Sequence, residues 1–335
     1  MESSASTHIS PHECVVSTGT RVHISLFDVG YATNRVFGGV GFALASPRVR
    51  VAAARGKSLK LVGFNSDERN YLIGAFNRLS RLTSLSPIGT VCLLEAPMAH
   101  VGFGRKTAVT LAALLAISRS YDHDFERETL WRASGRGGVS GIGLGAFFQG
   151  GLLIDSGREC EGHRVFAPSS MITPTQPPLL ALTLDFPIDW RCILLMPPGV
   201  HRHGLEELRV FSAAPLPSDE IRQVIQATMC GLVAAVQGDD LDLAGEALEV
   251  ILRMGFKRIE ILGQPPVVGN LIADVRLQTG LPVGMSSMGP LVYVLCRDGD
   301  SAIDKVYECA SRAGAEVLGI STFKRRGREP DVQEA

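Results

Sequence analysis

Short runs with apolar residues at alternate positions dominate the first hundred residues of the chain. A period of two is typical of strands that bury one face. The runs predict strands over 15–18, 21–29, 40–46, 48–54, 59–64 and 90–97. Between the second and third runs, YATNRVFGG (31–39) is too polar and too rich in glycine for the centre of a strand. We therefore expect several short strands before residue 100, interrupted by a loop over 31–39.

Apolar residues at helical spacing mark the helices. Tyr71, Leu72, Ala75, Phe76 and Leu79 predict a helix over 67–84, with Ser66 as its N-cap. Further helices are expected over 105–120, 124–134, 219–237, 239–255, 270–280 and 301–314, and further strands over 151–155, 179–187, 190–198, 291–297 and 315–323. This mixture of helices and strands predicts an α+β fold.

The length and one polar stretch indicate two domains. At about 150 residues per domain, a chain of 335 residues makes roughly two. The segment APSSMITPTQPP (167–178) is rich in Pro, Ser and Thr, a composition typical of a linker or long loop. We expect domains over 15–175 and 176–325, with a flexible tail over 1–14 and a frayed one over 326–335.

Charge and cysteine usage narrow the class of protein. The 33 Lys and Arg residues balance 34 Asp and Glu residues, which argues against a nucleic-acid partner. No run of 18 apolar residues is present and the first residues do not resemble a signal peptide, so no membrane association is expected. The seven cysteines include no closely spaced pair, which favours free thiols in a reducing, cytoplasmic compartment.

The first candidate site lies between the strand ending at Pro97 and the helix over 105–120. Gly102 and Gly104 permit a close approach of backbone to ligand, and the N–H groups at a helix N-terminus favour an anion. Arg105 and Lys106 add positive charge at the same turn, followed by Thr107. The segment GFGRKT does not match a P-loop. The pattern predicts phosphate binding, or alternatively a plain glycine turn that caps a buried helix.

The second candidate site is a segment with nine glycines between residues 135 and 157. Such a density is unfavourable in helices and strands, and indicates backbone that wraps around a ligand. Arg136 and Ser140 beside Gly137, Gly138 and Gly141 offer hydrogen bonds to phosphate oxygens. The alternative is a packing seam of small residues.

Three further segments carry candidate polar groups. Ser286 and Ser287 lie in a glycine-flanked loop, which is either an anion site or an ordinary turn. Arg21 and His23 share one face of the strand over 21–29, although a buried structural histidine is the more frequent case. His201-Arg202-His203 has alternate histidines but no evident third metal ligand. The run Lys324-Arg325-Arg326 is expected in a solvated tail.

Four blocks together resemble β-ribofuranosylaminobenzene 5′-phosphate synthases, a family of the GHMP kinase fold superfamily. They are RVHISLFDVGYATNRVFGGVGFAL (21–44), EAPMAHVGFGRKTAVTLA (95–112), SGRGGVSGIGLGAFFQGGLLIDSG (134–157) and GMSSMGPLVYVL (284–295). The resemblance implies two α+β domains, the second ferredoxin-like, with the active site in the cleft between them, and a homodimer. It also implies that phosphoribosyl pyrophosphate and a small aromatic carboxylic acid react to give a C-riboside 5′-phosphate, pyrophosphate and CO2, with Mg2+ as cofactor.

The choice of acceptor depends on the residues of the first glycine loop. GHMP kinases commonly have Gly-Leu-Gly-Ser-Ser where this chain has Gly102-Phe103-Gly104-Arg105-Lys106. Extra cations suit a dicarboxylate, so the chain most resembles pyrazole C-nucleoside synthases of the formycin and pyrazofurin type, which use an acceptor like 4-amino-pyrazole-3,5-dicarboxylate in antibiotic biosynthesis. The alternatives are a benzoate acceptor in the methanopterin pathway, an ATP-dependent small-molecule kinase, and a binding protein without catalysis.

The resemblance and the residue chemistry together assign roles. His23, Asp28 and Arg136 are the candidate catalytic residues, and Asp155 is the candidate for holding the metal. The candidates for binding phosphate and pyrophosphate are Gly102, Gly104, Arg105, Lys106, Thr107, Gly137, Gly138, Ser140 and Gly141. The candidates for contacting the rest of the substrates are Arg21, Arg35, His201, His203, Ser286 and Ser287.

Overall fold

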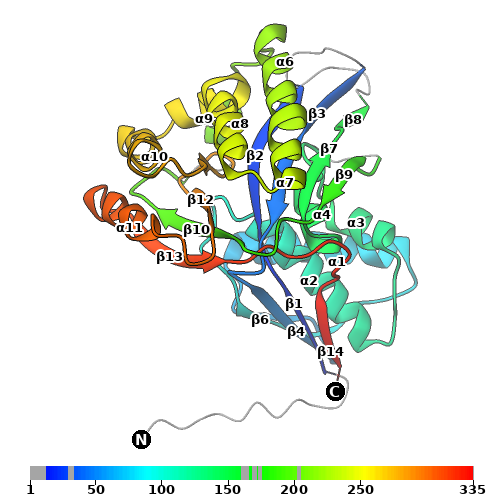
Figure 1. The fold of residues 1–335 in the computed structure, drawn as a ribbon. Coiled ribbons are helices and arrows are strands. Elements are labelled where there is room, and N and C mark those ends of the chain that lie inside the picture. The colour runs from blue at the N-terminus through cyan, green and yellow to red at the C-terminus, as the bar shows by residue number, and fades with distance from the viewer. Residues whose placement is uncertain are drawn as a thin grey trace, which may run out of the picture.

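Three β-sheets, with helices packed on them, make up the described part of the chain (Figure 1). The structure is a computed structural model that describes residues 13–28, 34–159, 166–167, 172, 176–201 and 205–334. Helices and strands are mixed along the whole sequence, which confirms the predicted α+β class.

The first sheet has the strand order β14-β1-β4-β6-β5. Its strands are β1 (Glu13–Thr18), β4 (Val49–Arg55), β5 (Lys60–Val62), β6 (Gly89–Glu95) and β14 (Asp331–Glu334). The helices α1 (Ser66–Leu82), α2 (Arg105–Ser120) and α3 (Arg127–Ser134) share one apolar core with it. Helix α2 contacts β1, β4, α1, α3 and α4 (Ile142–Phe148). This enclosure explains why its sequence is apolar on nearly every face.

The second and third sheets share the other large core. The second contains β2 (Arg21–Asp28), β3 (Arg35–Ala43), β7 (Leu152–Asp155) and β9 (Leu180–Leu184), with β8 (Arg158–Glu159) paired to β3. The third has the order β11 (Val283–Met285), β12 (Val292–Arg297), β10 (Trp190–Met196) and β13 (Glu316–Ser321). Phe42 of β3 and Tyr293 of β12 meet edge to face at 5.4 Å, so the two sheets pack directly on one another.

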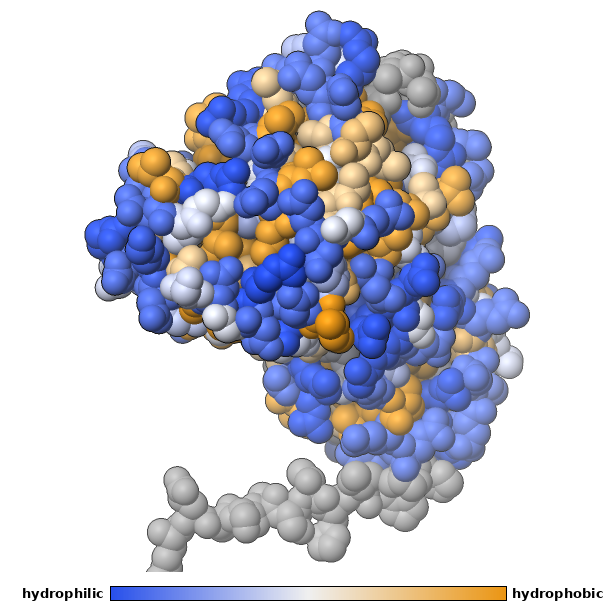
Figure 2. All heavy atoms as spheres, viewed as in Figure 1, coloured by the Kyte–Doolittle hydropathy of each residue, from blue (hydrophilic) through white to orange (hydrophobic). Residues whose placement is uncertain are grey.

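The remaining helices cover these two sheets. They are α5 (Leu205–Phe211), α6 (Ser218–Gln226), α7 (Val233–Gly238), α8 (Leu241–Arg253), α9 (Gly255–Leu262), α10 (Pro266–Thr279) and α11 (Ile303–Arg312), with a π-helical segment (Ala227–Leu232) between α6 and α7. Helices α10 and α11 pack on the third sheet. Figure 2 shows a mainly hydrophilic face with apolar patches, including one where α6 to α8 lie, and Ile225, Met229 and Val250 are exposed there.

Two local predictions in the first half were wrong. Helix α1 is capped by Asn65, not by Ser66: the Asn65 side chain accepts a hydrogen bond from the Glu68 N–H, and Glu68 bonds back to the Asn65 N–H. Strand β3 begins at Arg35, inside the expected loop. A Cβ on Gly39 would lie 2.4 Å from the Ser25 carbonyl oxygen, so this glycine lets β3 approach β2 and does not break the strand.

The second half also departs from the sequence pattern. Helices α5 and α9 were not predicted, and α10 starts at Pro266 rather than at residue 270, because proline is well suited to the first turn of a helix. The segment expected to fray is paired over 331–334, where β14 forms a ladder with β1. Lys324 is not solvated: it is buried, and its ammonium donates to the carbonyl oxygens of Ala146 (3.0 Å) and Phe147 (2.5 Å).

Other expectations concern the organisation of the whole molecule. The domain boundary at 175/176 stays a prediction; β9 and β14, which follow it, pair with strands β7 and β1 of the first half. None of the helices in the described part of the chain combines the length and the apolar character needed to cross a membrane. The homodimer and the cytoplasmic location stay predictions.

Candidate functional site

Two adjoining pockets lie where most of the predicted residues converge. An outer pocket of about 610 Å³ extends along the start of α2 and α1, and an inner pocket of about 100 Å³ extends along β2 and the glycine-rich loop. The residues that line both are Arg21, Thr107, Arg136, Glu207, Ser287 and Met288. Because they share this boundary, the two pockets form one cleft.

The N-terminus of α2 opens into the outer pocket. Gly104 is its N-cap residue with a φ of 69°, and no side chain caps the helix within the described residues. A Cβ on Gly104 would lie 2.8 Å from Arg21 Nε, and one on Gly102 would lie 2.8 Å from the Ser286 carbonyl oxygen. Both glycines have a positive φ and little room for a side chain, and the uncapped N–H groups can donate hydrogen bonds to an anionic ligand.

The two cations that follow this turn have different environments. Arg105 forms a two-pronged ion pair with Glu68, at 2.7 and 3.1 Å, and also donates to the Pro97 carbonyl oxygen at 2.5 Å. Its charge is thus already compensated within the protein, which was not expected. Lys106 lies with its ammonium 4.0 Å from the ring centroid of Tyr71, and burial, followed by the charge of Arg136, lowers its pKa.

Arg136 is held at the boundary between the two pockets. Its Nε donates to Thr107 Oγ1 at 3.0 Å, and its carbonyl oxygen accepts from the Trp131 indole at 2.7 Å. Its guanidinium also lies 5.9 Å from the ring centroid of Tyr71. The backbone and the side chain of Arg136 are therefore both fixed, which is what a residue that positions a charged substrate needs.

The residues of the second loop divide into two groups. Gly137 and Ser140 line the inner pocket. By contrast, a Cβ on Gly138 would lie 2.6 Å from the Ile172 carbonyl oxygen, and one on Gly141 would lie 2.5 Å from Pro178 Cβ. These contacts correspond to the packing seam considered as the alternative reading for this loop. They place Gly138 and Gly141 against protein rather than against the cleft.

The side chain of Asp155 fixes this glycine-rich loop. Its buried carboxylate accepts hydrogen bonds from the N–H groups of Gly141 (2.5 Å) and Gly157 (2.9 Å). Burial outweighs these bonds and raises the pKa of Asp155 to about 6. The described residues contain no group of three His, Cys, Asp or Glu side chains that could hold a metal ion. Asp155 therefore orders the loop, and these residues do not fit a resident Mg2+ site.

His23 lies in the inner pocket in its neutral form. Its Nε2 is 3.1 Å from Ser140 Oγ, and its buried Nδ1 has no hydrogen-bond partner among the described residues. Burial, and then the charges of Arg21 and Lys257, keep the pKa of His23 well below its ordinary value. The backbone of Asp28 ends the same strand, but its side chain lies outside the described residues, so its catalytic role stays a prediction.

The two neighbouring serines differ in what they contact. Ser286 is fully buried; its hydroxyl donates to the Gly102 carbonyl oxygen at 2.8 Å and accepts from the His23 N–H at 3.0 Å. Ser287 has a φ of 52° and lines both pockets. Ser286 therefore joins two backbone segments of the cleft, whereas Ser287 lines the cleft itself.

Two predicted substrate contacts among the described residues, Arg35 and His201, line neither pocket. Arg35 donates to the carbonyl oxygens of Ser156 (3.0 Å) and Gly157, which holds the turn after β7. His201 is exposed and lines neither pocket. The N–H of the preceding residue, Val200, donates to the Gln264 side chain, and that side chain donates to the carbonyl oxygen of Met288, which lines both pockets. His203 lies outside the described residues. Arg21 does belong to the site: it donates to the Gly102 carbonyl oxygen and lines both pockets.

Several cleft residues were missed from the sequence. Lys257 and Glu260 form a buried ion pair on α9, and Glu260 lines the inner pocket. Glu207 of α5 lines both pockets, and Tyr71, assigned to the core from its spacing, lies on the wall of the outer one. In the sequence GFKRIEIL of α9, the lysine and the glutamate three residues apart were the one feature that could have indicated this part of the site. Such pairs on a helix usually face solvent, so they did not suggest a buried ion pair.

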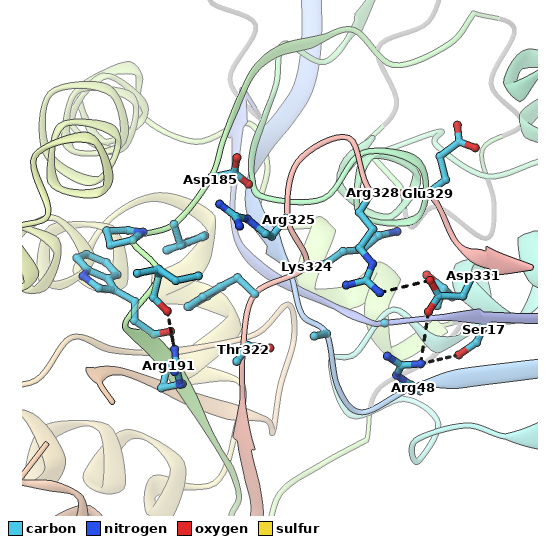
Figure 3. A pocket seen from close by; sticks show the side chains of 18 residues that line it. Ser17, Arg48, Asp185, Arg191, Thr322, Lys324, Arg325, Arg328, Glu329 and Asp331 are labelled. Carbon is cyan, nitrogen blue, oxygen red and sulfur yellow. Dashed lines mark hydrogen bonds and ion pairs between the residues drawn. The ribbon is translucent and has the colours of Figure 1, made fainter. Parts of the chain in front are cut away.

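A separate pocket of about 310 Å³ lies beside the segment that leads from β13 to β14 (Figure 3). It shares none of the described residues with the cleft. Figure 3 shows Arg48 and Arg328 directed at the same carboxylate, that of Asp331. The nitrogen–oxygen distance of each ion pair is 3.5 Å. With these cations paired, and with no predicted site residue in its lining, this pocket is not the candidate active site.

The comparisons with solved structures concern the fold. A homoserine kinase from Cytophaga hutchinsonii is 16% identical, with a TM-score of 0.68 and 99% of each chain covered. The phosphomevalonate kinase of Streptococcus pneumoniae is 11% identical, with a TM-score of 0.68, and covers 93% of this chain and 98% of its own. Such identities show the fold alone, and it is that of the GHMP kinases, as the sequence resemblance implied.

The comparisons with curated proteins concern the family. No family model matches the sequence. The β-ribofuranosylphenol 5′-phosphate synthase of Archaeoglobus fulgidus is 31% identical over 320 residues, which cover 94% of this chain and 98% of the relative. That of Methanocaldococcus jannaschii is 30% identical and covers 83% and 88%. Identity at this level over nearly the whole of both chains shows that this protein belongs to the β-ribofuranosylphenol 5′-phosphate synthase family.

Proposed function

We propose that this enzyme joins C1 of phosphoribosyl pyrophosphate to a ring carbon of an aromatic carboxylic acid and releases pyrophosphate and CO2. The observation that carries the proposal is the pairing of the two pockets. The outer one combines cations with an uncapped helix N-terminus, and the inner one has apolar and aromatic walls beside a neutral histidine. A charged sugar phosphate suits the first pocket, and an aromatic ring suits the second.

The outer pocket takes the donor. Lys106 makes no ion pair with another described residue, and Arg21 and Arg136 line the same space. These charges and the N–H groups at the start of α2 would stabilise the negative charge that develops on pyrophosphate as the C1–O bond breaks. Mg2+ would enter with the pyrophosphate as its counter-ion, because the described residues contain no group of three His, Cys, Asp or Glu side chains that could hold it.

The inner pocket takes the acceptor. Leu26, Val139, Phe211 and Phe256 form its apolar walls, and its volume of about 100 Å³ leaves room for no more than a single ring. Arg21 and Arg136 at the boundary would attract the acceptor's carboxylate, which places the carbon that bears this group next to the donor. Neutral His23, fixed by Ser140, is suited to orient the ring by a hydrogen bond.

The chemistry then needs only the two substrates. The ring carbon that bears the carboxylate attacks C1 as pyrophosphate leaves, through an oxocarbenium-like ribose. The bond to the carboxylate breaks next; CO2 departs, and the electron pair of that bond restores the aromatic ring. Arg136 is held so that it can contact the reacting groups at this junction, which is why we assign it the central role.

The favoured acceptor is 4-hydroxybenzoate, because replacing its carboxylate by ribose gives a ribofuranosylphenol, the product for which the curated relatives are named. A pyrazole dicarboxylate was favoured from the sequence by the extra cations of the loop. One of those cations, Arg105, is already paired with Glu68, and this pairing removes the main reason for preferring a second carboxylate.

The test is a mass-spectrometric assay with Mg2+, phosphoribosyl pyrophosphate and either 4-hydroxybenzoate or 4-amino-pyrazole-3,5-dicarboxylate. With the benzoate we expect pyrophosphate release and a riboside 5′-phosphate whose mass is that of the two substrates together less pyrophosphate and CO2. Product from the pyrazole alone would reverse the choice of acceptor. Consumption of ATP with another metabolite, and no reaction with either acid, would indicate a kinase and contradict the proposal.

A further inference from the structure

Lys257 and Glu260 place a buried pair of opposite charges against the inner pocket. Lys257 is fully buried and the Glu260 side chain is 4% exposed. Lys257 also donates to the Ser287 carbonyl oxygen at 2.7 Å, which fixes its ammonium. Among the described residues, the Glu260 carboxylate has no partner other than this ammonium. Buried carboxylates normally accept several hydrogen bonds, so this one retains capacity to accept another.

The position of the pair in the cleft is specific. Glu260 and His23 line the inner pocket alone, whereas Arg21 and Arg136 line the boundary with the outer pocket. If the acceptor's carboxylate lies at that boundary, the substituent opposite to it on the ring points into the inner pocket. For a hydroxybenzoate this substituent is the phenolic hydroxyl, and a carboxylate is a suitable hydrogen-bond acceptor for it.

We propose that Glu260 is the catalytic base for the acceptor's hydroxyl group, an inference that rests on the proposed function. The hydroxyl proton moves to the Glu260 carboxylate, and the resulting phenolate drives its para carbon onto C1 of the ribose. That C–C bond forms while the C1–O bond to pyrophosphate breaks. The bond to CO2 then breaks, its electron pair restores the phenolate, and the phenolate recovers the proton from Glu260. No oxidant or other reactant is required.

The surroundings of Glu260 fit this proton transfer. Burial raises the pKa of Glu260, while the charges of Lys257 and Arg21 oppose that rise. A base with a raised pKa both accepts and returns a proton more readily near neutral pH. The other titratable or charged side chains facing the inner pocket are His23 of β2, Arg136 of the glycine-rich loop and Glu207 of α5.

The proposal predicts a choice between acceptors. A phenol gains most of its ring activation by losing its proton, so it depends on a base. The neutral amino group of 4-aminobenzoate already has a lone pair to donate, and it needs no proton transfer before attack. Loss of the Glu260 carboxylate should therefore lower the rate with 4-hydroxybenzoate much more than the rate with 4-aminobenzoate.

The experiment compares Glu260→Gln with wild type on 4-hydroxybenzoate and on 4-aminobenzoate. General bases contribute about 100-fold to 10,000-fold. We expect kcat for 4-hydroxybenzoate to fall by about 100-fold or more, and kcat for 4-aminobenzoate to fall by less than about 5-fold. Glu220→Gln is the matched control, because Glu220 anchors the same helix through the Gly255 N–H and Arg258 but lines neither pocket.

A second variant and a second readout separate the possible outcomes. Lys257→Met combined with Glu260→Gln removes the uncompensated buried cation, in case the single variant does not fold. Binding of 4-hydroxybenzoate without the donor should produce the phenolate absorbance in wild type and not in the variants. Equal losses on both acceptors, or an unchanged phenolate band, would overturn the role of Glu260. If the wild-type enzyme turns over neither 4-hydroxybenzoate nor 4-aminobenzoate, the proposed function is refuted. The phenolate absorbance alone would then test whether Glu260 takes the hydroxyl proton.

Discussion

Replacing Ser286 and Ser287 separately by alanine should affect two different properties of the protein, although the two residues are adjacent. Ser286 is fully buried and bonds to the backbone of His23 and Gly102, while Ser287 lines the cleft. The first substitution should lower the stability of the protein, and the second should weaken substrate binding. Each variant serves as the control for the other.

The size of the stability effect follows from the hydrogen bonds that are lost. Ser286→Ala removes the acceptor of the His23 N–H, and a buried donor left without a partner costs about 1–3 kcal/mol. The Gly102 carbonyl oxygen keeps its bond from Arg21, so its loss is smaller. A total of about 2 kcal/mol corresponds to a decrease in Tm of about 3 °C for a chain of this size. Ser287→Ala should change the free energy of unfolding by less than about 0.5 kcal/mol.

Thermal unfolding and steady-state kinetics on the same preparations measure both effects. Ser286→Ala should lower Tm, and Ser287→Ala should raise the KM for a substrate with an unchanged Tm. If Ser286→Ala keeps the wild-type Tm and only raises KM, then Ser286 contacts the ligand, as its sequence context first indicated. In that case our structural assignment of its hydroxyl is incorrect.

Three further predictions concern the cation at the junction, the buried lysine and the metal. Arg136→Ala should reduce kcat by at least about 100-fold with an unchanged circular dichroism spectrum, because it removes a charge fixed beside both substrates; an unimpaired rate would refute its role. Burial lowers the pKa of Lys324 from 10.5 to about 8, so the folded chain binds this proton more weakly than the unfolded chain. The free energy of unfolding should therefore rise as the pH increases from 8 to 10.5, by up to about 3 kcal/mol, and parallel pH profiles for wild type and Lys324→Met would contradict this. Chelation of Mg2+ should stop turnover and leave the Tm of the free protein unchanged, since the described residues hold no metal cluster; a lower Tm would reveal a resident ion.

Part of the candidate cleft was predictable because several of its glycines occupy backbone conformations that favour glycine. Gly102 and Gly104 adopt positive φ where other segments approach closely, and Gly137 does so beside Arg136. Those restrictions are local, so they are visible in the order of the residues. The α+β class was predictable for the same reason, since the period of two and the helical spacing are also local patterns.

The partner of each charge could not be predicted in this way. Arg105 is paired with Glu68, 37 positions before it, and Asp155 accepts from the N–H of Gly141 on a loop folded against it. Helix α9, which carries Lys257 and Glu260, was missed because a charged pair at that spacing usually faces solvent. Only the tertiary fold buries this pair and directs it at the cleft.

The most direct test of the central claim follows 4-hydroxybenzoate labelled with 13C in its carboxyl group, together with phosphoribosyl pyrophosphate and Mg2+. We expect labelled CO2 and pyrophosphate in equal amounts, and an unlabelled product whose ribose C1 is bonded to carbon in its NMR spectrum. Retention of the label in the product, or a ribose bonded through oxygen, would contradict decarboxylating C-riboside formation by this enzyme.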